Sequence, residues 1–182
     1  MGRIRVHEFI SLDGVTESPS WTMAYPFDPK MGEAIARLPS PSRSILLGRN
    51  TYEMFEPAWS RRTAEDDPGA PFFNDTAKYI VSSTLDSASW SNSTILGPYA
   101  ADMIRAFKDG VDGDIYVSGS TELVRGMLAD GLVDELHLFV FPVALGTGKR
   151  LFGDGAEVKL ALVGSESYSS GVVHLTYAPA AA

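Results

Sequence analysis

The chain has 182 residues, of which 45% are hydrophobic, and this length and composition predict a single globular domain over residues 1–182. Its 15 Lys and Arg residues against 23 Asp and Glu residues give a formal net charge of −8, which repels phosphate backbones and argues against a nucleic-acid partner. The sequence has no cysteine, which excludes disulfides, thiolate nucleophiles, Cys-ligated zinc and iron–sulfur clusters.

The N-terminal segment predicts a strand, a long loop and a helix. A β-favouring run predicts a strand over residues 3–11 that ends at Asp13-Gly14. Residues 15–29 contain three prolines and three large aromatic residues without a period, which indicates an ordered loop of the kind that covers sites. Apolar residues at helical spacing then predict a short helix over residues 31–38.

The next segment predicts a strand, a glycine and a helix in direct succession. Residues 44–48 form a short apolar run that predicts a buried strand. A helix is expected over residues 49–55, ending before Pro57 because proline interrupts helical hydrogen bonds. Residues 57–76 are polar and are expected to be irregular.

The middle of the chain continues the alternation and repeats the arrangement of strand, glycine and helix. The expected elements are a strand at 78–82, a weaker strand at 94–96, a helix at 100–107, a strand at 114–118 and a helix at 123–128 that ends at Gly131. This order is typical of a mostly parallel sheet covered by helices.

The C-terminal third changes to period 2. Both faces of the strand expected at 134–141 are apolar, which predicts a central strand. Two further strands, 158–168 and 172–177, flank Ser169-Ser170-Gly171 and predict a hairpin, and the tail at 178–182 is expected to fray. The sequence therefore predicts an α/β sandwich with a mostly parallel sheet and an antiparallel hairpin at its end.

Two candidate anion sites follow from the junctions at Gly48-Arg49 and Gly119-Ser120, because a strand followed by glycine and a helix start presents backbone N–H groups to an anion. Neither is a Rossmann fingerprint or a P-loop. At the first junction the residue is Arg49. An arginine accommodates a 2′-phosphate, whereas an acidic residue at this place would bind a ribose diol, so Arg49 favours NADP(H) over NAD(H). The alternatives are glycines that only allow close packing, a solvated Arg49, and a simple turn at Ser82-Ser83-Thr84.

The sequence gives little support for metal binding or nucleophilic catalysis. His7, His137 and His174 lie on predicted strands without metal-ligand spacing, which argues against a metal site, and His137 and His174 are expected to be hydrogen-bonded strand residues. No nucleophile motif is present. The carboxylates near the aromatic loop could anchor a substrate or donate a proton, although most acids on this chain are expected to be solvated; they are Asp13, Glu17, Asp28 and Glu33.

Five motifs in order resemble a known family. They are Phe9-Ile-Ser-Leu-Asp-Gly14, Leu47-Gly-Arg-Asn-Thr-Tyr-Glu-Met-Phe55, Tyr79-Ile-Val-Ser-Ser-Thr84, Ile115-Tyr-Val-Ser-Gly-Ser-Thr121, and Gly131-Leu-Val-Asp-Glu-Leu-His-Leu with Pro142-Val-Ala-Leu-Gly-Thr-Gly-Lys-Arg-Leu-Phe152. Over residues 3–177 they resemble the dihydrofolate-reductase-like family that includes the C-terminal reductase domain of the bifunctional riboflavin-biosynthesis deaminase–reductase. The resemblance implies the three-layer αβα fold of that family and an NADPH cofactor along the carboxyl edge of the sheet.

The resemblance also implies roles for individual residues. The adenosine and 2′-phosphate side would be bound by Gly48, Arg49, Thr51, Ser82, Ser83 and Thr84, the pyrophosphate by Gly119, Ser120, Thr121 and Glu122, and the nicotinamide by Ile10, Ser11, Val15 and Thr16. Asp28, Asp13 or an ordered water would supply the proton. Trp21 would contact the substrate, and Lys149 and Arg150 would bind a substrate phosphate or else form a solvated basic pair.

The substrate implied by the resemblance is a pterin C=N bond or the ring-opened ribose of a pyrimidine ribosylamine phosphate. The absence of cysteine excludes the zinc deaminase of the bifunctional protein, which weakens an assignment to riboflavin biosynthesis. We therefore expect an NADPH-dependent reductase similar to 5-amino-6-(5-phosphoribosylamino)uracil reductase. The alternatives are dihydrofolate reductase proper and a nucleotide-binding module without turnover.

Targeting motifs bear on the location of the protein, and apolar strands bear on its assembly. No export signal, lipidation motif or apolar run of membrane-spanning length is recognised, which predicts a cytoplasmic protein without a membrane partner. The apolar strand at 134–141 and the C-terminal hairpin predict a homodimer in which they bury an edge against a second copy.

Overall fold

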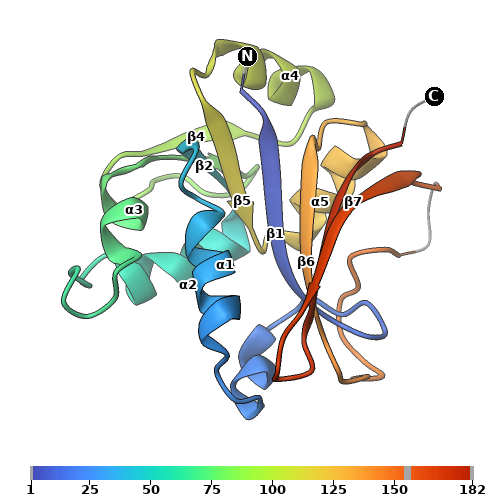
Figure 1. The fold of residues 1–182 in the computed structure, drawn as a ribbon. Coiled ribbons are helices and arrows are strands. Elements are labelled where there is room, and N and C mark those ends of the chain that lie inside the picture. Colours follow the sequence, from blue (N-terminus) through green and yellow to red (C-terminus); the bar gives the residue numbers. More distant parts are fainter. Residues whose placement is uncertain (1, 154–156, 181–182) are drawn as a thin grey trace.

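The computed structural model describes residues 2–153 and 157–180, which form one eight-stranded sheet with helices on its faces (Figure 1). The strands are β1 (Ile4–Ser11), β2 (Ser42–Gly48), β3 (Ala77–Val81), β4 (Ser93–Gly97), β5 (Asp114–Ser118), β6 (Glu135–Phe141), β7 (Leu160–Ser167) and β8 (Val173–Pro179). The helices are the 3₁₀ helix η1 (Pro19–Ala24) and α1 (Pro29–Arg37), α2 (Arg49–Trp59), α3 (Ala70–Asp75), α4 (Ala101–Gly110) and α5 (Thr121–Ala129).

The sheet is parallel except at its C-terminal edge. Its order is β4-β3-β2-β5-β1-β6-β8-β7. The strands from β4 to β6 in this order run parallel, whereas β8 pairs antiparallel with both β6 and β7. The predicted parallel sheet with a terminal hairpin is confirmed. Because the carboxyl ends of parallel strands lie at one edge, the loops after β1, β2, β3 and β5 converge there.

Two helical layers cover the sheet, so the predicted three-layer αβα arrangement is confirmed (Figure 1). On one face α4 and α5 bury apolar side chains, among them Ile104 and Met127. On the other face α1 packs Met31 on an aromatic core around Phe139, and α2 and α3 cover the β2–β3 half of the sheet. Burial of these apolar stripes is the main free-energy gain that holds the helices in place.

Three helical features differ from the sequence-based expectations. Helix α2 does not stop before Pro57 but continues to Trp59. The Trp59 ring stacks on Phe73 of α3 at 4.3 Å between centroids, and this tertiary contact offsets the hydrogen bond that a proline lacks. The segment expected to be irregular contains α3, and the aromatic loop contains η1; each begins with a proline in its first turn.

The C-terminal hairpin corrects two further expectations. Ala178 and Pro179 belong to β8 rather than to a frayed tail, since Ala178 pairs with Ala161 in the β7–β8 ladder; residues 181–182 lie outside the described residues. Strand β6 lies between β1 and β8 and has no free edge for a second copy. On this side of the sheet the edge strand is β7, on which Leu162 and Val163 are 58% and 65% exposed. The homodimer stays a prediction.

Candidate functional site

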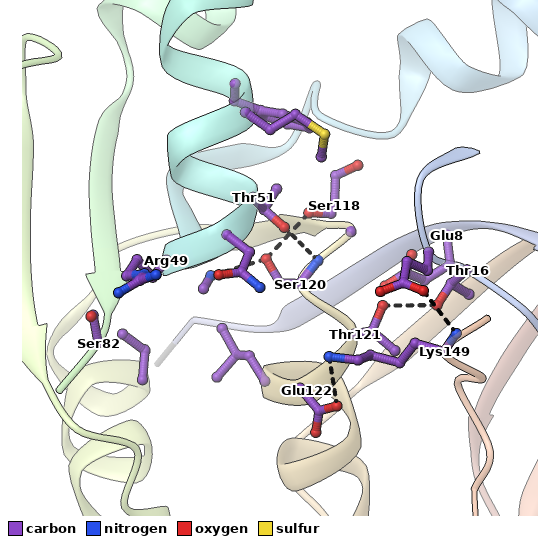
Figure 2. A pocket seen from close by; sticks show the side chains of 18 of the residues that line it. Glu8, Thr16, Arg49, Thr51, Ser82, Ser118, Ser120, Thr121, Glu122 and Lys149 are labelled. Carbon is purple, nitrogen blue, oxygen red and sulfur yellow. Dashed lines mark hydrogen bonds and ion pairs between the residues drawn. The ribbon is translucent and has the colours of Figure 1, made fainter. Parts of the chain in front are cut away.

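A cavity of about 730 Å³ opens where the parallel strands end (Figure 2). It is lined from the carboxyl ends of β1, β2, β3 and β5, the first turns of α2 and α5, and the loops after β1 and β6. The predicted site residues that line it are Thr16, Gly48, Arg49, Thr51, Ser82, Ser83, Thr84, Gly119, Ser120, Thr121, Glu122 and Lys149. The fold thus brings most of the predicted cofactor set to one cavity from segments far apart in sequence.

The N-termini of α2 and α5 meet in the middle of this cavity. The backbone N–H of Gly48 donates to Ser120 Oγ at 2.9 Å, and the N–H of Ser120 donates to Thr51 Oγ1 at 2.8 Å. Neither helix has a side-chain cap on its first N–H groups. The first turns of both helices therefore present N–H donors and positive dipole ends to the cavity, an arrangement that suits two linked phosphates.

A left-handed backbone lets the two helix starts approach each other. Gly119 has φ +61° and Ser120 has φ +60°. A Cβ atom on Gly119 would lie 3.2 Å from Thr51 Oγ1, closer than ordinary van der Waals contact, so this position needs glycine both for its conformation and for the space beside α2.

One end of the cavity carries a cation. Arg49 Nη1 donates to Thr84 Oγ1 at 2.7 Å, and its Nε lies 3.4 Å from Glu53 one turn further along α2. Ser82 Oγ accepts the N–H groups of Thr84 and Leu85 at 3.1 and 3.0 Å, so the β3 loop is the Ser/Thr turn that the sequence left open as an alternative. This turn and Arg49 face a space where an anion would be stabilised.

The opposite end is enclosed by two loops that pair with each other (Figure 2). Val15 forms a β-bridge with Arg150, and the N–H of Thr16 donates to the carbonyl of Lys149 at 3.0 Å. The Thr16 and Thr121 hydroxyls are 2.8 Å apart. Lys149 Nζ lies 3.1 Å from Glu122, and its hydrogen bond to that carboxylate is the largest cause that holds the pKa of Glu122 below its ordinary value.

Sequence reasoning missed Glu8, a carboxyl group of β1 that lines this end. Glu8 is only 2% exposed, and its Oε1 has no hydrogen-bond partner within the described residues. Burial raises its pKa well above the ordinary value for glutamate. The available signal was an acidic residue in the alternating series Ile4, Val6, Glu8 and Ile10, which otherwise forms an apolar face of the first strand.

Asp28, the predicted proton donor, does not line the cavity. It caps α1 by accepting the N–H groups of Lys30 and Met31 at 2.9 and 3.4 Å. Its other oxygen accepts the N–H and the hydroxyl of Ser169 at 2.8 and 2.6 Å. The hydroxyl of Ser169 is the largest cause that lowers the pKa of Asp28. In this arrangement the carboxylate fastens α1 to the β7–β8 turn, and an ionised, fully bonded group is a poor acid.

We expect Asp28 to make the protein acid-sensitive. Because the pKa of Asp28 is lower in the folded state, its contribution to stability is present above the ordinary Asp pKa of about 4 and is lost as pH falls through the folded value. Asp28→Asn, which cannot ionise, should lower the melting temperature at pH 7 and flatten its decline in acid. Melting followed by circular dichroism across this range checks both; Glu33→Asn on the exposed side of α1 should keep the wild-type profile.

The remaining predicted site residues lie around the cavity rather than in its lining. Ile10 belongs to the core, and Ser11 Oγ bonds to Asp13 at 2.6 Å. Asp13 also accepts the N–H groups of Leu145 and Gly146, and these hydrogen bonds, with that of Ser11 the largest, lower its pKa. The aromatic ring of Trp21 packs on Phe141. Ser11, Asp13, Val15 and Arg150 therefore shape the two paired loops.

The three histidines have structural partners. The Nδ1 atom of His7 lies 3.0 Å from the Tyr116 hydroxyl, and His137 and His174 are joined at 3.0 Å between ring nitrogens. Burial lowers the pKa of His137 to about 4 and that of His7 to about 3. All three histidines lie on strands, and burial favours the neutral form of each. Within residues 2–153 and 157–180 no group of three or more potential ligands could hold a metal ion.

The sheet order and the paired helix starts define an α/β domain of the dihydrofolate-reductase-like fold, and solved structures agree. A putative riboflavin biosynthesis protein from Shewanella sp. PV-4 has TM-score 0.79 at 20% identity, with both chains fully covered. Dihydrofolate reductase from Enterococcus faecalis, complexed with NADP(H), has TM-score 0.65 at 14% identity over 99% of this chain and 98% of that one. Acinetobacter baumannii RibD has TM-score 0.64 at 17% identity, over 99% of this chain and 58% of its own.

The family follows from the sequence comparison. Residues 3–174 match the RibD C-terminal domain, and the chain belongs to this family. A relative of similar length is the uncharacterized protein YyaP of Bacillus subtilis, which is 27% identical over 183 residues, covering 96% of this chain and 94% of the relative. In the part of the chain that the structure describes, no helix is long and apolar enough to cross a membrane.

Proposed function

We propose that the chain is an NADPH-dependent reductase that acts on a small nitrogen heterocycle or its ribosylamino adduct. The observation that carries this proposal is the order of groups along one cavity. A cation lies at one end, two uncapped helix N-termini lie in the middle, and apolar and acidic side chains lie at the other. This order matches a 2′-phosphate, a pyrophosphate and a nicotinamide.

The chain's own residues would hold the cofactor by its 2′-phosphate and by its pyrophosphate. The 2′-phosphate would bind Arg49 and the hydroxyls of Ser82, Ser83 and Thr84. Gly48 and Ser120 already donate their N–H groups to side chains, so the pyrophosphate would bind the next N–H groups, at 49–51 of α2 and 121–123 of α5. When bound, NADPH supplies the hydride for the reduction; the protein aligns the reactants and excludes water.

The cavity lining includes the aromatic and apolar side chains of Phe9, Met54 and Phe55, which suit a flat ring. The substrate would lie toward the end that Thr16 and Lys149 enclose. Lys149 and Glu122 form an ion pair at the rim of this end, where Lys149 could turn to a substrate phosphate. This arrangement supports a planar heterocycle, with or without a phosphorylated ribosyl group, as the substrate class.

Removal of Arg49 tests the cofactor assignment. We expect Arg49→Ala to weaken NADPH binding by about ten- to hundredfold, because a charge-assisted hydrogen bond contributes about 1.5–3 kcal/mol. NADH, which lacks the 2′-phosphate, should bind wild type and variant alike. Titration followed by the fluorescence of the reduced nicotinamide measures both affinities.

The matched control is Arg61→Ala, an exposed arginine outside the cavity lining, which should bind NADPH like wild type. Equal affinity of wild type for NADPH and NADH would contradict the assignment of Arg49, and no binding of either would contradict the reductase itself. Oxidation of NADPH with a panel of pterins, dihydrofolate and pyrimidine ribosylamines then separates the substrate classes. Binding without oxidation of NADPH on the whole panel would favour a binding module.

A further inference from the structure

Glu8 is placed where strand β1 reaches the cavity. Residues alternate between the faces of a strand, so Glu8 shares a face with Val6 and Ile10, which pack in the core beneath α5. Figure 2 shows Glu8 beside Thr16, near the start of α5. Glu8 is 2% exposed and is one of the residues that line the cavity, so its carboxyl group borders the space that a ligand would fill.

The surroundings of Glu8 favour its neutral form. Burial is the cause that raises its pKa, and a buried carboxylate without a cation is costly. Lys149, a cation that lines this end, pairs through its Nζ with Glu122 at 3.1 Å. The backbone N–H of Lys149 donates to the Glu17 carboxylate at 3.2 Å. Burial without a cation therefore favours the protonated form of Glu8 over the carboxylate.

Other titratable groups around β1 do not supply a counter-ion to Glu8. On β5, Tyr116 is buried and neutral because burial raises its pKa. On β1 itself, His7 points to the opposite face and is neutral. On β6, the residue paired with Glu8 is Leu138. The negative charges of Glu17 and Glu122 oppose the ionisation of Glu8, because like charges repel.

Asp13 and Asp28 do not compete for the role of acid. Both lie outside the cavity lining, and hydrogen bonds lower the pKa of each. Among the described carboxyl groups that line the cavity, Glu8 alone combines burial with an oxygen that has no partner. It is therefore the acid that can meet a ligand with its proton still bound.

We propose that Glu8 is the proton donor of the reductase, with the proton held on its carboxyl until the nicotinamide is oxidised. This inference rests on the proposed function. For a C=N substrate, a hydride adds to carbon, the electron pair of the π bond moves to nitrogen, and nitrogen takes the proton from Glu8. The carboxylate left on Glu8 would be stabilised by the positive charge of the oxidised nicotinamide, and water would reprotonate it after release of the products.

The test compares the affinities for NADP⁺ and NADPH as a function of pH. In wild type the positive charge of NADP⁺ should favour loss of the Glu8 proton. NADP⁺ binding should therefore tighten as pH rises, by up to about tenfold per pH unit, as long as the pH is below the pKa of Glu8 in the free protein. NADPH binding should not show this dependence. The 2′-phosphate titrates in both cofactors, so the ratio of the two affinities cancels its contribution.

Glu8→Gln should abolish the pH dependence of this ratio while NADPH still binds, because glutamine has the shape of the neutral acid but cannot ionise. The exposed Glu33→Gln should retain the wild-type dependence.

Infrared spectra should show a protonated carboxyl band in wild type at neutral pH that Glu8→Gln lacks. With whichever panel compound wild type reduces, Glu8→Gln should lower kcat by about 10²- to 10⁴-fold.

The outcomes separate the two proposals. A ratio with the same pH dependence in wild type and Glu8→Gln, or an ionised Glu8 in the infrared spectrum, overturns the role of Glu8 and leaves the reductase in place. Failure of both cofactors to bind wild type overturns the reductase and this inference with it. Circular dichroism of Glu8→Gln establishes that the variant is folded before the ratios are compared.

Discussion

Substitution of Gly119 by valine should weaken NADPH binding by at least about hundredfold. Gly119 has φ +61°, and a Cβ atom would lie 3.2 Å from Thr51 Oγ1. A β-branched side chain strains this left-handed backbone and displaces the hydroxyl that accepts the N–H of Ser120. The two helix starts then separate, and charge-assisted bonds of about 1.5–3 kcal/mol each are lost from the phosphates. Fluorescence titration measures the affinity.

Gly131 provides the matched control for this substitution. It has φ +65°, but a Cβ atom there meets nothing within 4 Å, and it lies at the far end of α5 from the cavity. Gly131→Val should cost about 1–2 kcal/mol of stability from the backbone alone and leave NADPH affinity unchanged. If both variants bind NADPH like wild type, the junction of α2 and α5 does not hold the phosphates.

The fold could be predicted from the sequence where the signal is local. The junctions at Gly48-Arg49 and Gly119-Ser120 combine a buried strand, a glycine and a helical stripe, and all three are readable within a few residues. Helix α3 and the continuation of α2 to Trp59 were not predictable in this way. Both depend on the stacking of Trp59 on Phe73, a contact that exists only after the two segments have packed.

The candidate site was predictable in part for a topological reason. Parallel strands place their carboxyl ends at one edge, so polar residues that follow β2, β3 and β5 meet there without any knowledge of side-chain contacts. Carboxyl groups are harder to assign. Asp28 stands at the expected distance from Trp21, but one of its oxygens caps α1 and the other accepts hydrogen bonds from Ser169, 141 residues away. Glu8 is concealed in a strand pattern that predicts only burial.

Truncation of Lys78 to alanine should destabilise the fold by about 4 kcal/mol. Lys78 is fully buried, and its Nζ donates to the carbonyls of Phe73, Asn74 and Thr76 at 2.8, 3.1 and 2.9 Å. These oxygens end α3 and have few other donors, so removal of the amine leaves buried acceptors unpaired. Truncation also leaves a cavity beside the Trp90 ring, which lies 4.5 Å from Nζ. Urea unfolding followed by circular dichroism measures the loss.

Lys78→Met separates the two contributions, because methionine refills most of the space and removes only the donor. We expect it to cost about 2 kcal/mol, roughly half the loss of Lys78→Ala, whereas the exposed Lys159→Ala should stay within about 0.5 kcal/mol of wild type. A Lys78→Ala variant as stable as wild type would mean that water replaces the amine at the three carbonyls. Because α3 packs on α2 through Trp59, the loss of stability in Lys78→Ala would also disturb α2, the helix that carries Arg49. The NADPH affinity of Lys78→Ala should therefore fall together with its stability. The NADPH affinity of Lys159→Ala should stay near that of wild type.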